Sequence, residues 1–214
     1  MSRQTRSTAK KLTRIHASNP ATRPARVPDL ESQLFEDANA WETWLQENHN
    51  DSTSLWLRLA KKDSGVTSVS YDEALDVALC FGWIDGQRKA LDAQHFTQRF
   101  TPRRKGSLWS KRNVTKVASL VEAGRMRPPG QAEMDAAQAD GRWERAYSSS
   151  SNADVPQDFQ AALDANEAAA EFFKTINRTQ RYAFIQRLET AKRPETRRRR
   201  IEQFVTLLGS GKCL

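Results

Sequence analysis

The stretch between residues 71 and 113 contains several consecutive structural signals and therefore limits the folds open to this chain. Ser70 and Glu73 form the pattern S-x-x-E, in which two side chains satisfy free backbone N–H groups at a helix start. We therefore predict a helix from residue 71. Gly82 ends this helix, because glycine is common just past a helix C-terminus. The residues WIDG at 83–86 then begin a strand.

A second strand and a second helix follow in the same stretch. Residues 95–100, HFTQRF, predict the partner of the first strand, and residues 87–93 predict a polar turn between them. Residues 102–106 form a basic loop. Ser110 predicts the N-cap of a helix that Gly124 ends, because apolar side chains repeat there at i, i+3, i+4 and i+7. This order of elements indicates a small sheet with helices packed against it.

The residues before this stretch add strands and a helix. Residues 54–61 read SLWLRLAK, and the leucine at every second position predicts a strand with one apolar face. Residues 31–35 predict a short strand. Asp37 predicts the N-cap of a helix that runs to about His49. Further along the chain, residues 128–141 predict another helix, which begins at two prolines and ends at a glycine.

The chain becomes helical after a serine-rich linker at 148–152. Residues 159–208 predict helices, the last with an apolar stripe. We therefore predict an α+β fold with a small mixed or antiparallel sheet and packed helices, followed by a helical C-terminal module. The expected division is a disordered basic tail (1–28), an α+β core (29–147), a linker (148–155) and a helical C-terminal module (156–210).

Charge alternates in blocks along the 214 residues, which carry a net charge of +8. Residues 85–127 hold eleven basic and three acidic side chains, and residues 174–200 hold ten and two. The tail at 1–28 holds seven basic side chains and no acidic one. Acidic and basic blocks either face each other and screen their charges, or the basic blocks converge into one surface for a polyanion. The sequence leaves both arrangements open.

Several classes of protein are not indicated. Cys80 and Cys213 predict no disulfide framework, so a reducing, cytoplasmic location is expected. No apolar run is long enough to cross a membrane and residues 1–28 lack the apolar centre of a secretory signal, so no membrane insertion is expected. The spacing of the three histidines fits no metal site, and we expect no metal or cofactor.

Residues 71–113 hold the densest mix of aromatic and cationic side chains in the sequence. Arginine matches phosphate or carboxylate with two parallel hydrogen bonds, and a tryptophan face can stack on a base. A helix N-terminus after Ser110 adds backbone donors. We therefore predict an anion-binding site made of Trp83, Asp85, Arg99, Arg103, Trp109, Lys111 and Asn113. The competing interpretation is core packing of the aromatic residues with solvated cations around them.

Two charged features have alternative interpretations. Asp85 fits a general base or orienting carboxylate, or else a partner in an ion pair with Arg99, Arg103 or Lys111. No arrangement for nucleophilic catalysis is present, and no catalytic residue is assigned. The arginines at 197–200 surround a helix, which argues against one tight ligand site. They predict either pairs four residues apart, Glu195–Arg199 and Arg198–Glu202, or a general surface for a polyanion.

Six blocks occur in the order found in one family: SLWLRLAKK (54–62), SYDEALDVALCFGWIDGQRK (70–89), RFTPRRKGSLWSKRN (99–113), GRMRPPG (124–130), DGRWERAY (140–147) and AKRPETRRRRI (191–201). These blocks resemble the YdeI/OmpD-associated (OmdA-like) family, also labelled bacteriocin-protection proteins. The resemblance covers residues from about 30 to 210 and excludes the tail. It implies a bacterial, cytoplasmic α+β protein with a role in envelope stress or bacteriocin tolerance, and it implies no established catalytic mechanism.

Three functions remain as hypotheses. The favoured one is a non-enzymatic stress or bacteriocin-protection protein that binds a small anionic ligand at the seven-residue site. The second is a nucleic-acid-binding protein that uses the tail and the basic blocks at 85–127 and 174–200. The third is an enzyme on a small anionic substrate, with Asp85 as base and Arg103 or Lys111 as electrostatic stabiliser.

Overall fold

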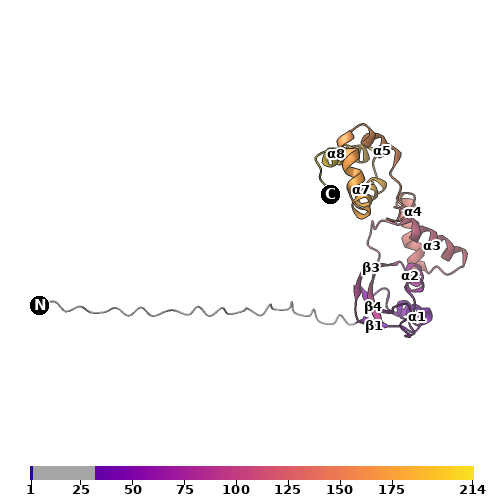
Figure 1. Ribbon diagram of the computed structural model, residues 1–214. Coiled ribbons are helices and arrows are strands. Elements are labelled where there is room, and N and C mark those ends of the chain that lie inside the picture. The colour runs from indigo at the N-terminus through magenta and orange to yellow at the C-terminus, as the bar shows by residue number, and fades with distance from the viewer. Residues whose placement is uncertain (2–31) are drawn as a thin grey trace. The chain divides into compact units, whose positions relative to one another are not determined.

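The computed structural model describes Met1 and residues 32–214, so the predicted basic tail at 1–28 lies outside the described residues apart from Met1. The fold is α+β with a helical C-terminal part, as the sequence predicts (Figure 1). Its first part contains β1 (Ser32–Leu34), α1 (Ala38–Asn48), β2 (Leu55–Ala60), α2 (Tyr71–Cys80), β3 (Trp83–Ala90), β4 (His95–Pro102), α3 (Lys111–Glu122) and α4 (Pro128–Ala139). Its second part contains α5 (Gln157–Asp164), α6 (Glu167–Thr175), α7 (Arg178–Glu189) and α8 (Pro194–Gly209).

Local capping explains where the first helices begin. The side chain of Asp37 accepts a hydrogen bond from Ala40 N at 2.8 Å, and Ser70 and Glu73 form the predicted reciprocal capping box. Ser110 accepts from Asn113 N at 3.2 Å. Each cap supplies an acceptor to a backbone N–H that has no partner within the helix. The predicted helix starts are therefore confirmed.

The four strands form one mixed sheet in the order β1-β2-β4-β3. β1 is parallel to β2, and the other neighbouring pairs are antiparallel. The predicted turn at 87–93 is wrong in its first half, because β3 continues to Ala90. Arg88 and Lys89 pair with Gln98 and Thr97 after a register shift, so the backbone ladder extends through exposed polar residues. Polar side chains do not prevent backbone pairing at the edge of a sheet.

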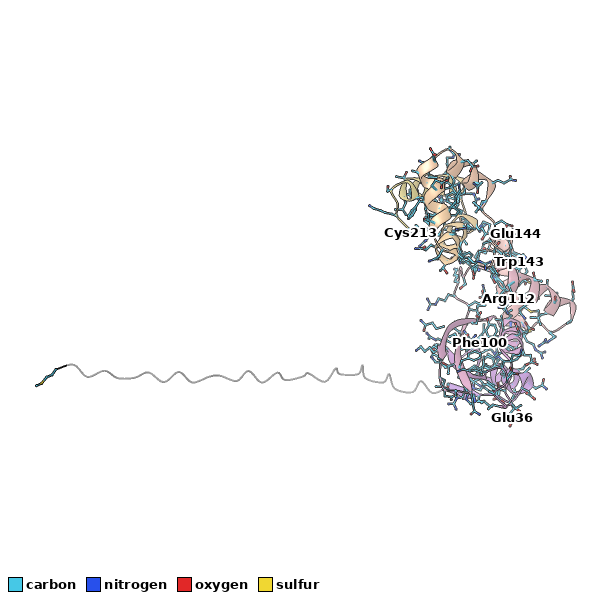
Figure 2. The ribbon with its side chains drawn as sticks, in the orientation of Figure 1. Glu36, Phe100, Arg112, Trp143, Glu144 and Cys213 are labelled. Carbon is cyan, nitrogen blue, oxygen red and sulfur yellow. The ribbon has the colours of Figure 1, made fainter. Side chains whose placement is uncertain are left out.

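One face of the sheet packs on α1 and α2 and forms the first hydrophobic core. Trp41 and Leu45 of α1 are fully buried and meet Leu57 and Phe100 of the sheet in this core. The rings of Trp41 and Phe100 lie 5.7 Å apart, and Phe100 is labelled among the side chains of the sheet in Figure 2. The core-facing leucines of β2 alternate with Trp56 and Arg58, as the pattern SLWLRLAK predicts.

The helical part has a separate hydrophobic core. Four phenylalanines dominate it, with ring centroids between 5.1 and 6.5 Å apart: Phe159, Phe173, Phe184 and Phe204. The predicted pairs Glu195–Arg199 and Arg198–Glu202 are not among the ion pairs of residues 32–214. Arg197 instead binds Asp158 of α5 at 2.6 Å, because the start of α8 lies against α5. None of the helices in the described ranges is long and apolar enough to cross a membrane.

Candidate functional site: a basic hollow beside a bulge in the sheet

The seven residues predicted to form one site lie in several different environments. Trp83 is 1% exposed and belongs to the first hydrophobic core. Its ring lies 6.4 Å from that of Trp41 and 6.0 Å from that of Trp44, in edge-on contacts. Trp83 therefore stabilises the sheet against α1 and presents no face to a ligand, which agrees with the core-packing interpretation for this residue.

Asp85 lies on the helix side of the sheet. The Tyr71 hydroxyl at the start of α2 donates a hydrogen bond of 2.7 Å to its carboxylate. The predicted ion pair with Arg99, Arg103 or Lys111 is not among the ion pairs of the described chain. The pleat explains this: Asp85 pairs with Phe100 and shares its face, whereas Arg99 points to the opposite face. Burial, and next the hydrogen bond to Asp85, raise the pKa of Tyr71 to about 12.

All three tyrosines are expected to ionise at a higher pH than an exposed tyrosine does. Burial is the largest cause that raises the pKa of Tyr71, Tyr147 and Tyr182. An alkaline titration followed by phenolate absorbance should therefore show no phenol with the ordinary pKa near 10 until a denaturant unfolds the chain. Because the folded state holds these protons more tightly, the free energy of unfolding should fall as the pH rises from about 10 to about 12. A phenol that titrates normally in the folded Tyr71→Phe variant would contradict the burial of the other two.

Arg103 and Trp109 form a buried stacked pair. The guanidinium carbon of Arg103 lies 3.7 Å from the Trp109 ring centroid, and Arg103 Nη2 donates to Leu108 O at 2.7 Å. Arg103 is 7% exposed, and its burial lowers its pKa to about 10. Arg103 Nε and Trp109 Nε1 are buried without a hydrogen-bond partner in the described structure. This pair fastens the loop after β4 to the core, because stacking and burial hold both side chains.

Lys111 and Asn113 lie in the first turn of α3. The Lys111 side chain is 65% exposed, and its ammonium is 3.8 Å from a carboxylate oxygen of Glu189. Asn113 is buried, and its backbone N–H bonds to the Ser110 cap. Neither residue lines the same cavity as Arg99. The structure therefore stacks Arg103 on Trp109, and Asp85 lies near enough that its charge partly opposes the lowering of the Arg103 pKa by burial. None of these three residues borders the cavity that Arg99 lines.

Arg99 lines a small hollow next to the register shift in β3. The hollow has a volume of about 230 Å³ and is bordered by Ile84, Gly86, Gln87, Arg99, Thr101, Pro102, Arg104 and Ser107. A Cβ added at Gly86 would meet Arg99 O at 3.6 Å, so this part of β3 lies directly against β4. The Ser107 hydroxyl accepts from Arg104 N at 3.0 Å, which closes the loop on the other side. The bulge and the loop together create the concavity.

The hollow has an uncompensated positive charge. Within residues 32–214, neither Arg99 nor Arg104 forms an ion pair, and no carboxylate borders the hollow. Arg99 Nε is buried without a hydrogen-bond partner. Two guanidinium groups and two hydroxyl groups, those of Thr101 and Ser107, are the chemistry that binds an oxyanion.

A larger hollow, of about 440 Å³, lies between the 150–155 segment and α7. Its two arginines already bind backbone oxygens: Arg178 Nε donates to Ser150 O at 2.7 Å, and Arg181 Nη2 donates to Lys174 O at 2.7 Å. These contacts fix local structure and leave less capacity for a ligand. In the part of the chain that the structure describes, no group of three or more His, Cys, Asp or Glu residues could hold a metal ion.

The predicted site omits four polar residues that border the hollow: Gln87, Thr101, Arg104 and Ser107. Arg104 belongs to the basic loop that the sequence predicts, but the sequence does not indicate that this loop lies beside Arg99. Gln87 was assigned to a turn, although it lies in the bulged part of β3. The combination of a glycine and a polar run within an expected strand is the signal that could have indicated a bulge.

Two sequence families match different parts of the chain. Residues 33–133 match the Domain of unknown function (DUF8412), and residues 152–211 match OmdA, described as Bacteriocin-protection, YdeI or OmpD-Associated. No curated protein and no solved structure matches the chain. The block AKRPETRRRRI lies within the OmdA match, whereas the blocks from 54 to 130 lie within the other one. Residues 152–211 therefore form a module similar to the bacteriocin-protection, YdeI/OmpD-associated family, which supports the resemblance seen in the sequence blocks.

Proposed function

We propose that this protein binds a small anionic ligand in the hollow beside the bulge and acts as a non-enzymatic protection protein, as the name of the family matched at residues 152–211 suggests. The observation that supports this is the pair Arg99 and Arg104, which border a concavity without any carboxylate. Unpaired cations repel each other, and an anion between them would replace this repulsion with charge-assisted hydrogen bonds.

The size of the hollow limits the ligand. A volume of about 230 Å³ is below the 300–1,000 Å³ or so that is usual for drug-sized molecules. It suits a phosphate, a sulfate, a carboxylate or the charged end of a larger molecule. The ligand's remaining atoms would extend over the open surface.

The enzyme hypothesis has less support from the geometry. Its proposed base, Asp85, is on the helix side of the sheet and accepts a hydrogen bond from Tyr71. It does not border the hollow, so it could not reach an anion held by Arg99 and Arg104. A general base must lie within hydrogen-bond reach of the proton it removes. Binding without catalysis is therefore the function that we propose.

Arg104→Gln should weaken the binding of inorganic phosphate by about tenfold or more, because a charge-assisted hydrogen bond contributes about 1.5–3 kcal/mol. Isothermal titration calorimetry of the full chain would measure this. Lys105→Gln is the matched control, because Lys105 is exposed, belongs to the same loop and does not border the hollow. Equal loss in both variants would show general electrostatic attraction, and no loss in either would place the anion elsewhere. Both results would contradict the proposal.

A further inference from the structure

The face of the sheet opposite α1 and α2 carries a basic surface with one large aromatic side chain. We call it the outer face and define it by Trp56, Arg58, Ile84, Lys89, Thr97 and Arg99. The strand register establishes this face. Between β2 and β4, Trp56 lies opposite Arg99 and Arg58 lies opposite Thr97. Between β3 and β4, Lys89 lies opposite Thr97. Directly opposed residues in antiparallel strands point to the same face.

None of the six residues that define the outer face is acidic, and Asp92 lies at the margin of this face, where it contacts His95 at 3.1 Å. Among the four strands the single carboxylate is Asp85, and it faces Tyr71 on the helix side. Arg58 donates to the hydroxyl of Ser32, which is neutral, so its charge remains uncompensated there. The hollow adds Arg104 at one end. A polyanion is therefore the complementary partner for this face.

Trp56 lies at the centre of these cations. It is 8% exposed but does not belong to the hydrophobic core around α1 and α2. The Lys89 ammonium lies 4.6 Å from its ring centroid, and Arg99 is its cross-strand neighbour. Lys89 is exposed and covers the ring with a flexible side chain. If the Lys89 side chain moves aside, the Trp56 ring becomes available for stacking. The Lys89 ammonium is then free to contact a phosphate.

An aromatic ring that is covered by a flexible lysine side chain and surrounded by cations is suited to single-stranded nucleic acid once the lysine moves. Bases stack on aromatic side chains, while basic residues follow the phosphates. We propose that the outer face binds single-stranded nucleic acid, with one phosphate in the hollow between Arg99 and Arg104 and a neighbouring base stacked on Trp56. This inference rests on the proposed anion binding at the hollow and names the molecule that supplies the anion.

The test compares a fluorescently labelled single-stranded DNA of about eight thymidines, a length within the usual site sizes, with inorganic phosphate as the second probe. Fluorescence anisotropy measures the affinity for the oligonucleotide, and calorimetry measures the affinity for phosphate. The full chain is used in every case. Trp56→Leu should weaken oligonucleotide binding by about tenfold, because stacking contributes about 1–3 kcal/mol per base. Trp56→Phe should retain most of the affinity. Both variants should bind phosphate as the parent chain does.

The controls separate the possible failures. Arg104→Gln should weaken the binding of both the oligonucleotide and phosphate, and Lys105→Gln should weaken neither. All variants retain residues 1–28, so any contribution of the basic tail is the same in each. A circular dichroism melt establishes whether Trp56→Leu is folded. If it is not, the exposed Lys89→Gln variant provides the result, because it removes the cation beside the Trp56 ring and should weaken oligonucleotide binding while phosphate binding stays unchanged. Phosphate binding at the hollow with oligonucleotide binding unchanged in folded Trp56→Leu, or in Lys89→Gln where Trp56→Leu is unfolded, would overturn this inference alone. If Arg104→Gln binds both the oligonucleotide and phosphate as tightly as the parent chain does, the proposed function is overturned as well.

Discussion

Trp41→Ala is expected to lower the free energy of unfolding by about 3–5 kcal/mol, the range for removing a large buried aromatic side chain. Trp41 is fully buried and its ring meets those of Phe35, Trp44, Trp83 and Phe100. Its indole N–H also donates to Ala74 O at 3.1 Å, which links α1 to α2. The substitution therefore removes the contacts of this ring with the sheet and the hydrogen bond that joins α1 to α2. Urea unfolding followed by circular dichroism would measure the change.

Trp41→Phe is the matched control. It retains an aromatic ring in the core but removes the indole donor, whose net contribution is about 1 kcal/mol. Its cost should be less than half that of Trp41→Ala. A loss below about 1 kcal/mol in Trp41→Ala would mean that α1 does not hold the sheet as the structure shows.

Gly130→Ala is expected to destabilise the protein by about 3 kcal/mol, the upper part of the range for an added group in a packed interior. A Cβ at residue 130 would lie 2.2 Å from Cys80 O and 2.6 Å from Leu79 O. These atoms belong to the backbone at the end of α2, so no side chain can rotate away. The start of α4 would have to separate from α2, which would expose residues now buried between them. The same unfolding measurement applies.

Gly209→Ala tests whether the effect at residue 130 comes from this contact. Gly209 is also helical, but its added Cβ would meet Asn166 Oδ1 at 3.5 Å, an ordinary contact distance. Alanine has a higher helix propensity than glycine by about 1 kcal/mol, so this variant should be unchanged or slightly stabilised. Similar behaviour of the two variants would show that α4 can move away from α2 at little cost.

Most of the secondary structure was predictable because its signals are local. The capping box at Ser70 and Glu73 requires only four consecutive residues, and it places the start of α2 correctly. The leucine alternation in β2 likewise reports its two faces. The end of β3 was not predictable, because Arg88 and Lys89 extend the strand through pairing with a neighbouring strand. Backbone pairing of this kind depends on the partner as much as on the side chains.

The candidate site was predicted only in part. Arg99 does border the hollow, but Trp83 and Asp85 point to the helix side of the same sheet. Residues that are close in sequence alternate between faces, so a dense stretch of aromatic and basic residues cannot form one site across a strand. Trp56 shows the opposite case: β2 brings it beside Arg99 from more than forty positions away.

The sequence by itself determined the fold class, the helix starts, the two faces of β2 and the resemblance of the C-terminal module to its family, since all of these are carried by short patterns of neighbouring residues. Only the tertiary structure decided which charges meet. Strand register and the bulge between Asp85 and Arg88 place Arg99 beside Arg104 and across from Trp56. Register and bulges arise from contacts between distant segments, and these contacts determine the surface that a ligand would encounter.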